Sequence, residues 1–135
     1  MTYFVTGATG FIGRYLVQSL LQRGKGTIYV LVRPKSVGKL DELREFWGKE
    51  SVKRVVPIKG DLGSPKLGVS PADVRKLKGK VKHFFHLGAV YDIEASAETM
   101  KKANIVGTQG ALDLAAAVNA GCFHLVSSIA AAGLY

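Results

Sequence analysis

Three glycines recur at three-residue intervals near the start of the chain, in the stretch VTGATGFIG. Gly7, Gly10 and Gly13 follow a β-type run at residues 2–6 and lead into a helical pattern that begins at Phe11. In a dinucleotide-binding turn, the first glycine permits the turn, the second lets the backbone approach the pyrophosphate, and the third lets the helix pack on the sheet. The free N–H groups of the helix then bind phosphate. The sequence predicts such a site here, against the alternative of a glycine-rich turn without a ligand.

Basic residues follow the second β-type run, residues 27–32, in the stretch LVRPKS. A site for NAD usually has an acidic side chain near this point, which binds the ribose 2′-hydroxyl. Arg33 stands there instead, with Lys35 and Ser36 nearby. A guanidinium suits a 2′-phosphate because it combines a full charge with a planar set of donors. We therefore expect NADP(H) as the cofactor; the alternative is an exposed arginine at the sheet edge.

Two further segments are expected to lie against the cofactor. Asp61 and Leu62 follow the third predicted strand, where a carboxylate can accept a hydrogen bond from the adenine amino group and a leucine can pack on the ring. An aspartate that only stabilises a turn is the alternative. Gly88 and Ala89, in the stretch HLGAV, are small, which suits backbone in contact with a cofactor.

Two histidines in the fourth predicted strand raise the question of a metal site. His83 and His86 are three residues apart, so on a strand they point to opposite faces. With no cysteine or acidic residue to complete a ligand set between them, the sequence predicts no metal site.

Strand and helix patterns alternate along the whole chain. The β-type runs lie at residues 2–6, 27–32, 52–58, 81–87 and 122–128, and the helical patterns at 11–23, 36–47, from 70, and 95–119. This alternation predicts a parallel sheet covered on both faces. We expect an α/β, doubly wound Rossmann-type domain over residues 1–135 with strand order 3-2-1-4-5, ending after its fifth strand, with the site at the carboxyl edge.

The composition narrows the classes of protein to which the chain can belong. The chain has 135 residues, 47% of them hydrophobic, but no apolar run long enough to span a membrane and no signal-peptide pattern at its start. Cys122 is the only cysteine, which fits a reducing, cytoplasmic location. The net charge of +9 suits either a polyanion-binding surface or a solvated face. The aromatic residues form no stacking pattern, so we expect no nucleic acid partner.

Several motifs together resemble one enzyme family. TGATGFIG, GDL, FHLGAVYD, NIVGT and HLVSSIAAAG occur in the order typical of the extended short-chain dehydrogenase/reductase superfamily. YFVTGATGFIGRYLV, YVLVR, LGAVYD and VSSIAAAGLY are similar to the N-terminal domain of bacterial fatty acyl-CoA reductases and thioester reductases. The resemblance implies hydride transfer from NADPH to an acyl thioester or aldehyde, in lipid metabolism.

The resemblance also implies site residues. The implied cofactor-binding residues are Thr6, Gly7, Thr9, Gly10, Phe11, Ile12, Gly13, Arg33, Lys35, Asp61, Leu62, Leu87, Gly88, Ala89 and Ser127. Ser128 matches the Ser/Thr that orients the carbonyl, and Asn104 matches a helix asparagine that supports the site; a loop serine and a locally bonded asparagine are the alternatives. The family's Tyr-x-x-x-Lys pair is absent, because none of the five tyrosines is followed by lysine four positions on.

The chain is therefore expected to bind the cofactor with little turnover of its own, as the N-terminal part of a reductase. Two alternatives stay open at this point: a nucleotide-sugar epimerase or dehydratase on the same scaffold, and a non-catalytic dinucleotide-binding module. Exposed sheet edge and apolar surface would also favour self-association, so a homo-oligomer is a further expectation.

Overall fold

The computed structural model describes residues 2–8, 11–23, 26–33, 37–61, 65–87 and 97–125. Within these ranges, only the backbone is described for residues 11, 12, 37 and 97–104. All statements below refer to this part of the chain.

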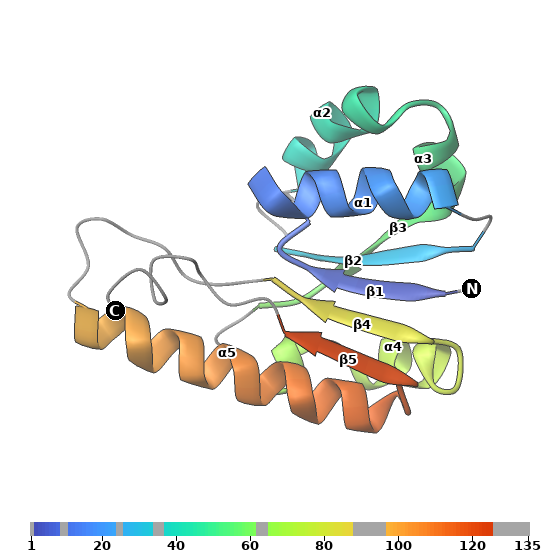
Figure 1. The fold of residues 1–135 in the computed structure, drawn as a ribbon. Helices are drawn as coiled ribbons and strands as arrows, with labels where there is room; N and C mark the ends of the chain where they lie inside the picture. The colour runs from blue at the N-terminus through green and yellow to red at the C-terminus, as the bar shows by residue number, and fades with distance from the viewer. Residues whose placement is uncertain are drawn as a thin grey trace.

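Five parallel strands form a single sheet (Figure 1). In chain order they are β1 Tyr3–Thr6, β2 Ile28–Val32, β3 Val55–Lys59, β4 His83–His86 and β5 Cys122–Leu125. Their order across the sheet is β3-β2-β1-β4-β5, which confirms the predicted doubly wound fold. Residues Thr6 and His86 pair at the carboxyl ends of the two central strands β1 and β4. The order reverses between these strands, which is where such folds bind ligands.

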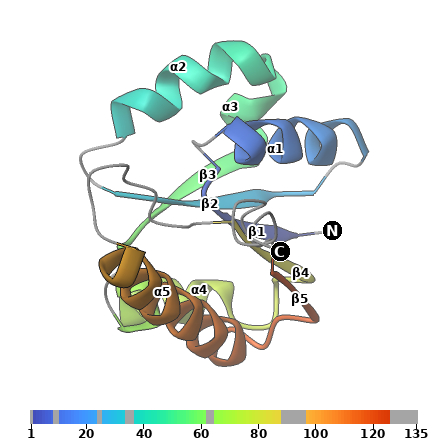
Figure 2. The same cartoon turned by 60° about the vertical axis from the view of Figure 1, so that its left-hand side comes forward.

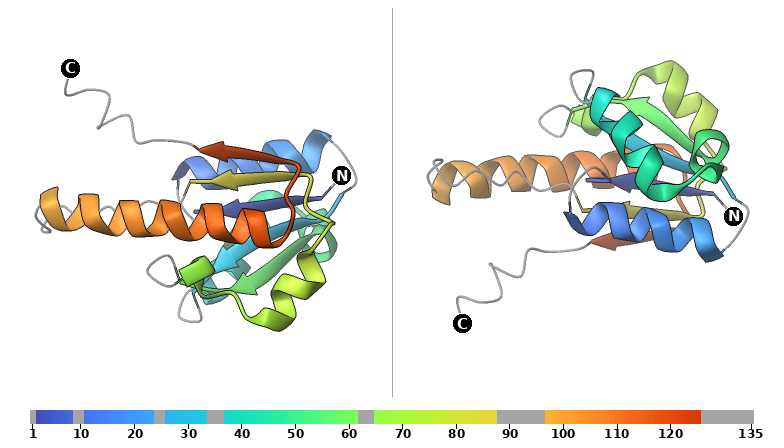
Figure 3. Two further views of the ribbon diagram at one scale, coloured as in Figure 1. Left: turned by 90° about the horizontal axis from the view of Figure 1, so that it is seen from below. Right: turned by 90° about the horizontal axis from the view of Figure 1, so that it is seen from above.

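Helices cover both faces of the sheet, as Figures 2 and 3 show. On one face lie α1 Phe11–Arg23, α2 Val37–Trp47 and α3 Glu50–Arg54; on the other lie α4 Pro71–Leu77 and α5 Ala97–Ala117. A short 3-10 turn, η2 Pro65–Gly68, packs against α5. None of the described helices is long and apolar enough to cross a membrane.

The hydrophobic residues of the strands separate into two cores because successive side chains point to opposite faces. Phe4 and Phe84 stack in the core under α4 and α5, with ring centroids 4.8 Å apart. Val5 and Val30 lie in the core under α1 and α2. Each fully buried aliphatic or aromatic side chain stabilises the fold by about 1.5–3 kcal/mol. Together the two cores hold the central strands at fixed positions.

The third predicted strand differs from the observed one at its start. Residues 52–54 were expected to be extended, but they belong to α3, and β3 begins at Val55. The reason is tertiary: Arg54 donates to the carbonyl oxygens of Leu21 at 2.8 Å and Gly26 at 3.0 Å, and so ties α3 to the end of α1. Pro57 lies in β3 at the edge of the sheet, where a missing N–H is tolerated.

The other predicted elements are close to the observed ones. The helix expected from residue 70 is α4, which Ser70 caps, since its hydroxyl accepts a hydrogen bond from the Asp73 backbone N–H at 3.2 Å. The segment between β3 and α4 contains η2, in which Lys66 and Leu67 have positive φ angles. Of the fifth predicted strand, residues 122–125 are extended and 126–128 lie outside the described part.

Candidate cofactor-binding site

The turn from β1 into α1 has the backbone geometry that its glycines predict. Gly7 has a φ angle of 75°, a conformation that other residues rarely adopt. A Cβ on Gly13 would collide with the carbonyl oxygen of Gly7 and lie 2.8 Å from the Cα of Ala8. The first turn of α1 therefore contacts the end of β1 directly. The backbone N–H groups that begin α1 are free of intrahelical partners and can bind an anion.

A buried hydrogen-bond network joins the ends of β1 and β4 beside this turn. The hydroxyl of Thr6 lies 2.8 Å from Nδ1 of His86 and accepts the backbone N–H of Leu87 at 3.1 Å. Both side chains are buried. Burial lowers the pKa of His86, so its ring is neutral near pH 7. With the Thr6 oxygen accepting from Leu87, the hydroxyl hydrogen can be donated to Nδ1, which favours the tautomer protonated at Nε2.

This network contains one predicted site residue and one that was not predicted. The side chain of Thr6, which is expected among the cofactor-binding residues, is fully buried and bonded to His86, so it positions the strand ends; its contact with a cofactor stays a prediction. His86 was not among the predicted site residues. The signal that could have found it is a polar residue at the last position of each of two central strands, since such residues become neighbours in a parallel sheet.

Arg33 and Asp61 lie at the same edge, after β2 and β3 respectively, and both are exposed. Asp61 is positioned by its backbone N–H, which donates to the Leu67 carbonyl at 2.7 Å. Gly60 makes this approach possible, because a Cβ there would collide with the Leu31 side chain and the Leu67 carbonyl oxygen. Sequence reasoning missed Gly60, since the contact depends on the path of η2.

The remaining predicted residues are not all described. Thr9, Gly10, Lys35, Leu62, Gly88, Ala89, Ser127 and Ser128 lie outside the described residues. For Phe11, Ile12 and Asn104 only the helical backbone is described, in α1 and α5. The predicted cofactor contacts that the structure brings to the carboxyl edge are therefore Thr6, Gly7, Gly13, Arg33, Asp61 and Leu87.

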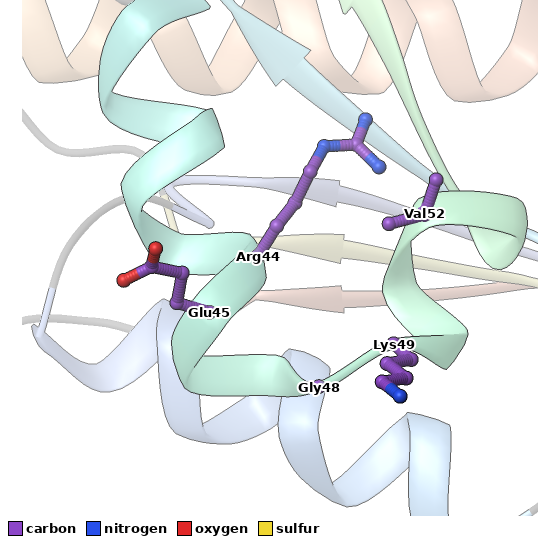
Figure 4. Close-up of a pocket in the computed structure, with 5 residues that line it drawn as sticks. All are labelled: Arg44, Glu45, Gly48, Lys49 and Val52. Carbon is purple, nitrogen blue, oxygen red and sulfur yellow. The ribbon is translucent and has the colours of Figure 1, made fainter.

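A surface hollow of about 400 Å³ lies away from this edge, at the junction of α2 and α3 (Figure 4). It is lined by Arg44, Glu45, Gly48, Lys49 and Val52. The Arg44 guanidinium donates to the carbonyl oxygens of Ser51 at 3.0 Å and Val55 at 3.3 Å. Because α3 leads directly into β3, this hollow lies at the amino end of the sheet. Its arginine is a structural link between helix and strand.

Comparison with known proteins identifies the family. A model of the NAD-binding domain family described as male sterility protein matches residues 5–135. The chain belongs to this family. Membership confirms the resemblance predicted from the motifs and implies a nicotinamide dinucleotide as the cofactor.

The proteins that this male sterility family domain resembles in sequence are much longer than the chain itself. A linear gramicidin synthase polypeptide of Brevibacillus parabrevis is 36% identical over 93% of this chain, which covers 3% of that protein. The L-2-aminoadipate reductase large subunit of Penicillium chrysogenum is 34% identical over 96% of this chain, covering 10% of that protein. A Drosophila melanogaster protein assigned by name to the fatty acyl-CoA reductases is 35% identical over 82% of this chain, covering 24% of that protein.

Solved structures of the same kind share the fold. The terminal R domain from the myxalamid PKS-NRPS pathway superimposes with a TM-score of 0.81 at 32% identity. It is matched over 95% of this chain and 35% of its own. The reductase domain of a nonribosomal peptide synthetase from Mycobacterium tuberculosis superimposes with a TM-score of 0.77 at 27% identity, over 94% of this chain and 33% of its own. This chain thus spans about a third of the reductase domains that it resembles.

Proposed function

We propose that the chain is the NADPH-binding domain of a reductase that acts on an acyl thioester or aldehyde. The observation that carries the proposal is the β1–α1 turn, where Gly7 has a positive φ and Gly13 leaves no room for a side chain. This geometry clears the start of α1 for a pyrophosphate. The names of the relatives, which include fatty acyl-CoA and aminoadipate reductases, support reduction as the reaction.

The proposed contacts follow from the chemistry of each group at the carboxyl edge. The N–H groups after Gly7 would hold the pyrophosphate, and the Arg33 guanidinium would hold the 2′-phosphate with charge-assisted hydrogen bonds. The Asp61 carboxylate would accept from the adenine amino group. Leu87 would lie beside the cofactor at the end of β4. The other residues proposed from the sequence are Thr6, Thr9, Gly10, Phe11, Ile12, Lys35, Leu62, Gly88, Ala89 and Ser127.

NADPH would supply the hydride that adds to the substrate carbonyl carbon. On the protein side, we propose that the Ser128 hydroxyl donates a hydrogen bond to the carbonyl oxygen as negative charge develops there. Asn104 would support the geometry of the site from α5. The 135 residues contain no Tyr-x-x-x-Lys pair to protonate that oxygen. We therefore expect this chain alone to bind cofactor and to turn over little substrate.

Two measurements distinguish the proposed function from the alternatives. Titration of the chain with NADPH and NADH should show binding of both, with NADPH at least about tenfold tighter because of the 2′-phosphate. Failure to bind either dinucleotide would overturn the proposal. The complete gene product should oxidise NADPH with acyl-CoA or aldehyde; turnover of nucleotide sugars instead would favour the epimerase or dehydratase alternative.

A further inference from the structure

A second group of reactive side chains lies on the face of the sheet that carries α1. His83 begins β4, and Cys122 and His124 lie on the neighbouring strand β5. His83 pairs with Cys122 in the strand register, and His124 follows two residues later, so all three side chains share one face. His86 lies on the opposite face, bonded to Thr6. The sequence-based prediction of no metal site considered His83 together with His86 only. It missed Cys122 and His124, which β5 places beside His83.

The three potential ligand atoms converge. One ring nitrogen from each histidine and the sulfur of Cys122 all lie within 4.8 Å of one another. Nδ1 of His83 and Nε2 of His124 are 3.1 Å apart. Two nitrogens bound to one tetrahedral zinc ion at 2.0–2.1 Å are separated by about 3.3 Å. The observed separation therefore needs an adjustment of only about 0.2 Å to admit the ion.

Neighbouring aromatic rings hold both imidazoles in orientation. His124 stacks on Phe85 with ring centroids 4.5 Å apart, and His83 stacks on Tyr3 at 5.8 Å. Both histidine side chains are partly buried, whereas Cys122 is exposed. The ligand group is therefore supported from one side and accessible from the other, so an ion can enter and keep a solvent ligand.

We propose that His83, Cys122 and His124 form a binding site for one Zn²⁺ ion. Two imidazoles and one thiolate are ligands that zinc prefers, and three protein ligands leave a fourth position for water. Before an ion binds, one of the two facing nitrogens carries the hydrogen that lies between them. When Zn²⁺ binds, that ring changes to its other tautomer, with the proton on its other nitrogen. The Cys122 thiol releases its proton to solvent. The site is distinct from the cofactor site, since it lies on strand faces rather than at the carboxyl edge.

Cobalt substitution tests the proposal on the 135-residue chain. We expect metal-free protein to bind one equivalent of Zn²⁺, and Co²⁺ in its place to give a thiolate-to-cobalt charge-transfer band with the intense visible bands of tetrahedral coordination. Cys122→Ser should abolish the charge-transfer band and weaken Zn²⁺ at least tenfold, since even outer-shell changes cost 10–100-fold. His83→Gln should also weaken Zn²⁺ at least tenfold.

The matched control is His86→Asn, which removes a histidine from the same strand but the other face. It should retain the cobalt spectrum and the stoichiometry of the unmodified chain. Cys122 is exposed, so its serine variant is expected to fold, which circular dichroism checks; Cys122→Ala repeats the test without a hydroxyl. A cobalt complex without a thiolate band, or unchanged zinc affinity in both folded Cys122 variants, would overturn the proposal.

Discussion

Thr6 and His86 show how single side chains prepare the candidate site. Their hydrogen bond of 2.8 Å joins the two strands between which the sheet order reverses. Gly7 and Gly13, which form the turn, are predictable from their spacing in the sequence. Predicting the Thr6–His86 pair requires knowing which strand ends are neighbours. The cluster of His83, Cys122 and His124 was missed for the same reason, because the local sequence does not show strand register.

Gly13→Ala tests the close approach at the turn. The added methyl would overlap the Gly7 carbonyl, so we expect a loss of about 1–3 kcal/mol in the free energy of unfolding. We also expect at least tenfold weaker dinucleotide binding. Gly38→Ala in α2 is the control: nothing lies within 4 Å of its Cβ, and the change should be neutral or stabilising by up to about 1 kcal/mol. Urea unfolding and NADPH titration measure both effects, and equal behaviour of the two variants would contradict the geometry.

His86 predicts a specific pH dependence of stability. Burial lowers its pKa below 6.5, so between that lowered value and 6.5 the unfolded chain binds more protons at this residue than the folded chain. The contribution is present above pH 6.5 and is lost as the pH falls toward the lowered pKa, with a slope of up to about 1.4 kcal/mol per pH unit. His86→Asn should remove this part of the slope. Parallel stability profiles of the two proteins, from urea unfolding at several pH values, would refute the assignment.

Elements were predictable where hydrophobic periodicity was long and uninterrupted. The glycine turn with α1, the central strands and α5 were expected close to their observed bounds. Helix α3 was missed because its last three residues, 52–54, continue the β-type pattern of β3, and their helical state depends on the bonds of Arg54 to Leu21 in α1 and to Gly26 before β2. A short helix of this kind is stable only through tertiary bonds, which local sequence does not report.

Arg54→Ala measures how far one side chain holds α3 in place. Loss of its two bonds to the Leu21 and Gly26 carbonyls should lower the free energy of unfolding by about 2–3 kcal/mol, since bonds to charged groups are stronger than average. Lys53→Ala, at the exposed neighbouring position, should change it by no more than about 0.5 kcal/mol. If both variants unfold at the same urea concentration, α3 is held by other contacts.

For the whole molecule, the predicted domain class and strand order are confirmed, while cofactor choice and substrate are proposals. The chain covers about a third of the reductase domains that it resembles. In the described part, Leu125 at the end of edge strand β5 is 52% exposed. Self-association stays a prediction, and this edge is where we expect it. The assignment of the basic net charge to a solvated face also stays a prediction.

The central claim is that the carboxyl edge of the sheet, where Arg33 follows β2, binds NADPH through its 2′-phosphate. The ratio of NADH to NADPH dissociation constants, measured by titration on the unmodified chain and on Arg33→Ala, tests it most directly. We predict a ratio of at least about 10 that falls close to 1 in the variant, through weaker NADPH binding, because in the proposed site the guanidinium would contact the 2′-phosphate that NADH lacks. Arg23→Ala, exposed at the opposite end of α1, should keep the original ratio. Equal losses of NADPH and NADH affinity in Arg33→Ala would contradict the account.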